Sequence, residues 1–163
     1  MPTRRRRTGT ALAALALVVG LASGCTAGDW DYDSPPAAGV QQDDGPIKVR
    51  NLMLLADGEG EGLLLGSIFS TEPLELVQVG VAGEQPDGSF GQPVEVPLSG
   101  DVPVQGSLML GDSNSRVEGA DLREGLTAMV IMRFSDGTTS TMEAPVLSAE
   151  HSDYTQAWDK AQA

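Results

Sequence analysis

The chain has 163 residues, of which 23 are acidic and 10 are basic, and its formal net charge is −13. This length predicts one domain with extensions rather than two full domains. The negative charge argues against binding to nucleic acid or to anionic lipid headgroups without a bridging cation. Four of the basic residues are the arginines at positions 4–7, so the rest of the chain is more acidic still.

Residues 1–24 have the pattern of a bacterial lipoprotein signal peptide. A basic cluster precedes the apolar segment 11–22, which is shorter than the roughly 20 residues that cross a bilayer core and fits a signal-peptide h-region. The letters LASGC at positions 21–25 resemble a lipobox, in which small residues precede a lipidated cysteine. The sequence therefore predicts cleavage between Gly24 and Cys25 and lipid attachment at Cys25.

Two other functions of Cys25 fit the sequence poorly. A disulfide needs a second cysteine, and the chain has one cysteine only. A catalytic thiol needs a nearby base, and the only histidine, His151, lies close to the other end of the chain. We therefore expect Cys25 to anchor the protein to the extracytoplasmic face of the cell membrane.

The mature chain divides into three parts by composition. Residues 25–45 contain Gly, Pro, Asp, Gln and Ala without apolar periodicity, which predicts the lipidated cysteine followed by a disordered linker. Residues 46–147 contain short apolar runs separated by turn-forming residues, which predicts an all-β sandwich of about seven strands. The expected strands are residues 47–56, 63–70, 74–82, 94–98, 102–111, 126–134 and 138–146.

Residues 148–163 form a tail that is compatible with one short helix. Ser152 is a candidate N-cap, and an apolar face would contain Tyr154, Ala157, Trp158 and Ala161. So short a helix is marginal alone, so it either packs on the domain or frays. We favour a frayed or lightly docked tail.

Two strand patterns carry further predictions. The expected strand 47–56 ends in a nearly continuous apolar run, which is typical of a strand buried on both faces. Asp136-Gly137 predicts a two-residue hairpin turn. With that turn, Met142 lies opposite Ile131 and on the same face as Met129.

Thioether groups suit Cu(I), so Met129 and Met142 are candidate ligands, although methionine on a strand ordinarily fills the core. The mature chain has five methionines. They are Met53, Met109, Met129, Met132 and Met142.

No pattern of catalytic residues stands out. The single histidine lies in the tail, which argues against a serine or cysteine hydrolase. The acidic stretch 57–62 matches the first half of an EF-hand loop, but the position of the bidentate glutamate is occupied by Ile68. We expect no enzyme activity and no cofactor.

Two segments give the chain a family resemblance. They are IKVRNLMLLADGEGEGLLLGSIFS and LREGLTAMVIMRFSDGTTSTMEAPV. With the lipobox and acidic linker, they resemble the actinobacterial LpqE-like lipoproteins, distant relatives of the PCu(A)C-type periplasmic copper chaperones. The resemblance covers residues 46–147 and implies a cupredoxin-like or immunoglobulin-like sandwich.

The copper chaperones bind Cu(I) with a His-x-Met pair, and the resemblance places Asn114 and Arg116 at these two positions. Neither side chain is a soft ligand, so the resemblance does not bring the metal site with it. The sequence thus predicts a membrane-anchored accessory or protein-binding module, with Asn114, Arg116 and Glu118 as candidate contacts to an envelope protein. The alternative is a Cu(I)-handling chaperone that uses methionine ligands.

Overall fold

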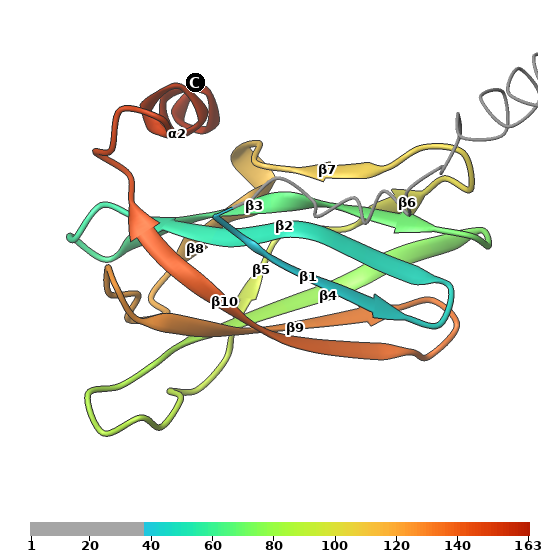
Figure 1. The fold of residues 1–163 in the computed structure, drawn as a ribbon, viewed down its shortest axis with the longest axis horizontal. Coiled ribbons are helices and arrows are strands. Elements are labelled where there is room, and N and C mark those ends of the chain that lie inside the picture. Colours follow the sequence, from blue (N-terminus) through green and yellow to red (C-terminus); the bar gives the residue numbers. More distant parts are fainter. Residues whose placement is uncertain (1–37) are drawn as a thin grey trace, which may run out of the picture. The chain divides into compact units, whose positions relative to one another are not determined.

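The computed structural model describes residues 38–163, which contain ten strands and one short α-helix (Figure 1). The strands are β1 (Val40–Asp44), β2 (Ile47–Ala56), β3 (Glu61–Ser70), β4 (Leu74–Gly83), β5 (Val94–Val96), β6 (Gly100–Val102), β7 (Leu108–Leu110), β8 (Arg116–Glu118), β9 (Thr127–Phe134) and β10 (Thr139–Ser148). A 3-10 turn, η1 (Ser113–Ser115), precedes β8, and helix α2 (Thr155–Gln162) ends the chain.

The strands form one continuous sheet that folds over to make a sandwich, in the order β5-β4-β9-β10-β2-β3-β7. We call the part built from β1, β2, β3, β7 and β8 sheet A, and the part built from β4, β5, β6, β9 and the first half of β10 sheet B. This architecture confirms the predicted all-β sandwich. Strands β1 and β8 had not been predicted, and the expected strand 102–111 is divided in the structure between the end of β6 and β7.

Strand β10 joins the two sheets. Up to Pro145 it pairs antiparallel with β9, and from Val146 it pairs parallel with β2, beginning opposite Leu54. Pro145 has no backbone N–H to donate, so it suits the point at which a strand leaves one ladder for another. Within the described residues, β10 is thus the strand whose hydrogen-bonded pairing joins sheet B to sheet A.

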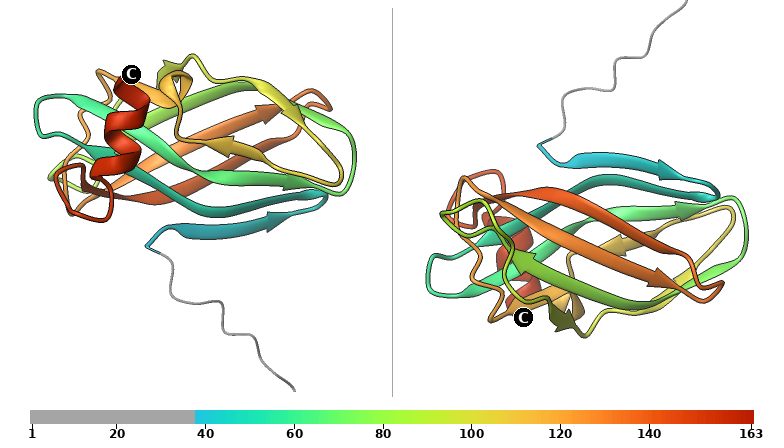
Figure 2. Two further views of the ribbon diagram at one scale, coloured as in Figure 1. Left: turned by 90° about the horizontal axis from the view of Figure 1, so that it is seen from above. Right: turned by 90° about the horizontal axis from the view of Figure 1, so that it is seen from below.

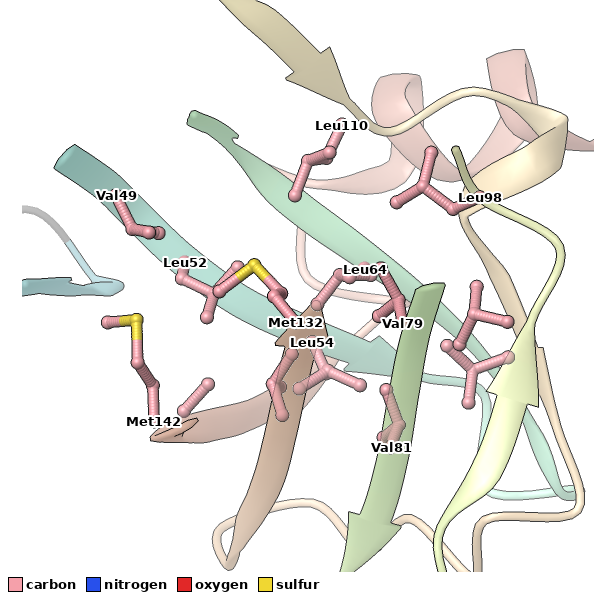
Figure 3. Packing of buried hydrophobic residues seen from close by; sticks show 14 of the residues in the cluster. Val49, Leu52, Leu54, Leu64, Val79, Val81, Leu98, Leu110, Met132 and Met142 are labelled. Carbon is pink, nitrogen blue, oxygen red and sulfur yellow. The ribbon is translucent and has the colours of Figure 1, made fainter. Parts of the chain in front are cut away.

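The main core lies between the two sheets (Figure 3). Strands β9 and β10 alternate between buried and exposed positions, as expected for strands with one face in the core. Leu54, Leu64, Val79 and Met132 are completely buried there. The core therefore uses side chains from both sheets.

The end of β2 is buried on both faces, as its continuous apolar run predicted. Leu54 contributes to the core between the sheets, while Leu55 packs on the other side with Leu63 and Ala161. Ala161 belongs to α2, which therefore covers the outer face of sheet A. The tail is docked through this small cluster.

Two predicted boundaries need correction. Strand β1 lies inside the segment 25–45 that was predicted to be a disordered linker, and it pairs with β2. Helix α2 begins after Tyr154, whose side chain makes no capping hydrogen bond, so Ser152 is not the N-cap. The first difference arises because Gly45-Pro46 closes a hairpin that pairs Asp44 with Ile47.

The β9–β10 hairpin also differs from the prediction. The Gly137 N–H donates to the Phe134 carbonyl, and the Phe134 N–H donates to the Thr138 carbonyl. Only Gly137 has a positive φ, of 89°, so residues 135–137 form the longer hairpin loop, in which a type I turn precedes a left-handed residue. The pairing shifts by one residue, and Met142 lies opposite Val130 instead of Ile131.

Candidate functional site

The first candidate site lies where β1 and β10 separate. Both strands run along the same edge of β2, because β3 occupies its other edge over the whole length. Strand β1 pairs with the first half of β2, whereas β10 pairs only with its end. The divergence of the two strands, which Figure 2 shows from two sides, leaves a hollow between them.

We call this the β1–β10 hollow, and its volume is about 370 Å³. Its lining residues are Val40, Gln41, Gln42, Met129, Thr141, Met142 and Glu143. The Gln42 side-chain N–H donates to the Ser140 hydroxyl over 3.2 Å, which ties β1 to β10. Ser140 is buried, so this hydrogen bond satisfies a hydroxyl that would otherwise be costly to bury.

Met129 and Met142 both line this hollow, but they do not share a face of the hairpin as predicted. The one-residue change of register puts Met142 on the core side, where 5% of it is exposed. Met129 lies on the outer side, opposite Glu143. The two side chains therefore reach the hollow from opposite faces of the β9–β10 hairpin. Both can line it because, in the described part of the chain, the first half of β10 has no paired strand on the edge that borders the hollow.

The other methionines of the described residues lie elsewhere. Met53 and Met132 are buried among apolar side chains. Met109 is 65% exposed and lies on β7, opposite Ser67 of β3. Within residues 38–163, no group of three or more His, Cys, Asp and Glu side chains is placed to hold a metal ion.

Glu143 is the one carboxylate that lines the hollow, and the remaining polar lining groups are neutral. Thioether sulfur is a soft ligand that suits Cu(I), whereas carboxylate and amide oxygens suit harder cations. Met129, Met142 and Glu143 thus bring two thioethers and a carboxylate to the lining of one hollow, and Met142 also belongs to the core cluster between the sheets.

The second candidate site is the loop that contains Asn114, Arg116 and Glu118. The Arg116 guanidinium forms an ion pair of 2.5 Å with Glu61 and donates a hydrogen bond of 2.6 Å to Gln162 of α2. Glu118 lies opposite Glu61 in the β3–β8 ladder. The family resemblance places Arg116 at the position of a chaperone ligand, and this cation is already paired with Glu61.

This loop has a fixed conformation. The Ser115 hydroxyl is completely buried and accepts the Gly111 N–H over 2.9 Å. The Asp112 carboxylate accepts the Asn114 N–H over 3.1 Å. A second hollow of about 360 Å³ lies beside the loop, and its lining residues are Glu95, Pro97, Ser113, Arg116 and Glu118.

Sequence reasoning missed the contribution of β1 to the first site. Val40, Gln41 and Gln42 fell in the predicted linker, so no lining role was assigned to them. The signal was present as Gly45-Pro46, a common turn dipeptide, directly before the expected strand 47–56.

Cys25 and the predicted signal peptide lie outside the described residues. Among the residues that are described, no helix is both long and apolar enough to cross a membrane.

No protein-family model matches the chain, and no curated protein matches it. Solved structures with similar folds include the apo PCuAC domain from PmoF1, with 18% identity and a TM-score of 0.47 over 67% of this chain and 99% of that domain. The apo PCuAC domain of PmoF2 has 16% identity and a TM-score of 0.48, over 68% of this chain and 97% of that one.

The copper-bound PCuAC domain from PmoF2 has 17% identity and a TM-score of 0.41, over 67% of this chain and 98% of that domain. Each of these three PCuAC domains resembles this chain distantly in fold. The narrower resemblance to LpqE-like lipoproteins stays a prediction. Whether this chain handles copper depends on its own side chains.

Proposed function

We propose that the protein is a lipid-anchored envelope protein whose β-sandwich carries Cu(I) as cargo in the β1–β10 hollow. The observation that supports this function is that Met129 and Met142 line the same open hollow. Two thioethers without an imidazole or a thiolate make a weak and exchangeable site. Such a site suits a protein that passes the ion on, rather than one that retains it.

The side chains at the hollow are suited to adjustment around an ion. Methionine has three rotatable bonds and adapts to irregular surroundings, so the half-buried Met129 side chain can adjust its position around an ion. Glu143 adds a negative charge beside the hollow, which favours a bound cation over an empty site.

An anaerobic Cu(I) titration against a competing chromophoric chelator tests this proposal. The protein for this test is residues 26–163, which contain the whole described fold with its own core. We expect one Cu(I) per chain, and we expect Met129→Leu and Met142→Leu each to weaken binding at least tenfold. Leucine nearly conserves the volume of methionine, so these variants should keep the fold.

Met109→Leu is the matched control, because Met109 is an exposed methionine on the other sheet. It should leave the affinity unchanged. If the wild-type protein does not compete with the chelator, or if all three variants bind equally well, the copper proposal is wrong.

A second candidate function is a non-catalytic module that binds an envelope protein through the Arg116 loop. The observation that favours it is the fixed, charged hollow beside Ser113, Arg116 and Glu118. Crosslinking in the native membrane, with Asn114, Arg116 and Glu118 all replaced by alanine, tests it. Recovery of a partner that does not change in this variant would exclude the loop as the contact.

The anchor is tested separately from both functions. We expect the wild-type protein to incorporate a labelled fatty acid and to sediment with membranes, and Cys25→Ala to lose both properties. Incorporation of label into the Cys25→Ala variant would show that another group carries the lipid.

A further inference from the structure

The outer face of sheet B carries a groove that has no residue in common with the β1–β10 hollow and shares only Glu95 with the hollow beside Arg116. Its volume is about 290 Å³, and its lining residues are Gln78, Val79, Gly80, Pro93, Val94, Glu95, Ile131 and Arg133. We call it the Gly80 groove. It crosses β5, β4 and β9, because Glu95 pairs with Gly80 and Gly80 pairs with Ile131 in the two ladders.

Gly80 makes the floor of this groove. A side-chain carbon added there would lie 3.5 Å from the nearest atom, in Pro93, which is ordinary contact. The backbone therefore does not require glycine at this position, and the missing side chain leaves space for a group from outside. Ile131, half-buried beside Gly80, projects from the same face.

Two opposite charges stand on the two sides of the groove. Glu95 on β5 and Arg133 on β9 are both exposed, and neither forms an ion pair with another residue of the described chain. Arg133 lies two residues beyond Ile131 along β9, opposite Gln78 of β4. The face thus carries the cation of Arg133 on one side and the anion of Glu95 on the other. Between them lie the projecting side chain of Ile131 and the recess at Gly80.

We propose that this face binds a second copy of the chain in a two-fold symmetric dimer. A symmetric pair uses the same patch on both subunits, so each patch must complement itself. From strand spacings of about 4.8 Å and a rise of about 3.3 Å per residue, the Cα atoms of Glu95 and Arg133 lie roughly 12 Å apart across the face.

We consider a two-fold axis that lies in the plane of the face, midway between Glu95 and Arg133 of one copy. Rotation about this axis places each Glu95 opposite the Arg133 of the other copy. The same axis brings each Ile131 close to Gly80 of the other copy. The projecting side chain then fills the recess, and both charges are paired at once. An unrelated partner would need to supply all of these features, whereas a second copy already has them.

Residues 26–163 keep all 23 acidic residues but only six of the ten basic ones, so their formal net charge is −17, which opposes association of two copies. At about 0.15 M salt the screening length is about 8 Å, so distant repulsion is screened more than the close pairs of the interface. The two Glu95–Arg133 contacts are therefore decisive for the pairing. Reversal of either charge alone should convert both contacts into repulsions.

Sedimentation equilibrium of residues 26–163 over a series of concentrations tests the dimer. We expect the mean mass of the wild-type protein to rise to twice that of the monomer. Glu95→Arg alone and Arg133→Glu alone should each remain monomeric. An equimolar mixture of these two variants should again reach twice the monomer mass, because each reversed charge then meets its opposite on the other copy.

The mixture distinguishes pairing between copies from any effect within one chain. Arg123→Glu and Glu124→Arg make the matched control, because both are exposed charges in the loop before β9. These variants should dimerise alone as the wild-type protein does. Gly80→Leu, which fills the recess without a change of charge, should also abolish the dimer.

Three results would overturn the proposal. The first is a wild-type protein that stays monomeric at every concentration, which would leave the face to another partner. The second is a dimer that survives the single charge reversals. The third is a mixture of the two variants that stays monomeric while circular dichroism shows that both are folded.

Discussion

The two outer faces of the sandwich are covered to different degrees. On sheet A, beside which α2 lies in Figure 1, Leu55 and Leu63 are completely buried in a cluster that includes Ala161 of α2. On sheet B, Ile131 is half-buried and lies beside Gly80. Within residues 38–163, the tail covers the outer face of sheet A, and no helix covers the outer face of sheet B.

The two faces differ in sequence as well as in cover. The end of β2 is apolar at every position, because the two sides of that strand contact different parts of the chain. Strand β9 alternates strictly between buried and more exposed residues. The pattern of a strand therefore reports whether its outer face is covered, even before the covering element is known.

The largest expected effect comes from a cavity beneath α2. Leu55→Ala should lower the free energy of unfolding by about 2–5 kcal/mol, the cost of removing a fully buried leucine side chain. Ile131→Ala, on the uncovered face, should cost only about 1 kcal/mol, because less of its surface is withdrawn from water. Urea unfolding of both variants under monomeric conditions measures the difference, and equal losses would contradict it.

A smaller effect is expected from the helix itself. Trp158 is half-buried against the cluster under α2, so Trp158→Ala should cost about 2 kcal/mol, less than for a fully buried tryptophan. Gln156→Ala on the exposed side of α2 is the control and should change stability little. If thermal unfolding shows no difference between the two variants, the helix does not stabilise sheet A.

The smallest effect concerns the carboxylate of Glu84, which directly follows β4. Hydrogen bonds from the Thr127 hydroxyl and N–H lower the pKa of Glu84 below its ordinary value. The ionised form therefore stabilises the fold above the ordinary pKa, and this contribution is lost as the pH falls through the lowered pKa.

Glu84→Gln should thus be less stable than the wild-type protein at neutral pH, and this difference should shrink in acid. Urea midpoints at a series of pH values measure it. Glu72→Gln, at an exposed position before β4, should follow the wild-type profile, and a constant difference for Glu84→Gln would refute the linkage.

Local sequence patterns predicted most of the sandwich. Short apolar runs separated by turn-forming residues identified β9 and β10, and the continuous run in β2 correctly indicated burial on both faces. What covers β2 could not be read locally, since α2 and Leu55 are far apart in the chain. The tail's apolar face, which contains Trp158 and Ala161, was recognised without its docking surface.

The candidate copper site was predicted only in part. Both methionines were singled out, but the hairpin register depended on whether Asp136 as well as Gly137 adopts a positive φ. Only Gly137 does, and this one-residue difference reverses the side to which Met142 points. The contribution of Gln42 required the pairing of β1, which the polar composition of residues 40–44 concealed.

The passage of β10 from one sheet to the other has a consequence for how fast the sandwich forms. Hairpins such as β9–β10 join neighbours in the sequence, whereas the parallel pairing of Val146 with Leu54 joins the two ends of the domain. Contacts between distant residues carry a large loop-closure cost, and proteins rich in them fold in milliseconds to seconds. We therefore expect the hairpins to gain protection against hydrogen exchange early in refolding and the end of β2 to gain it last, so that closure by β10 limits the rate at which the native protein appears.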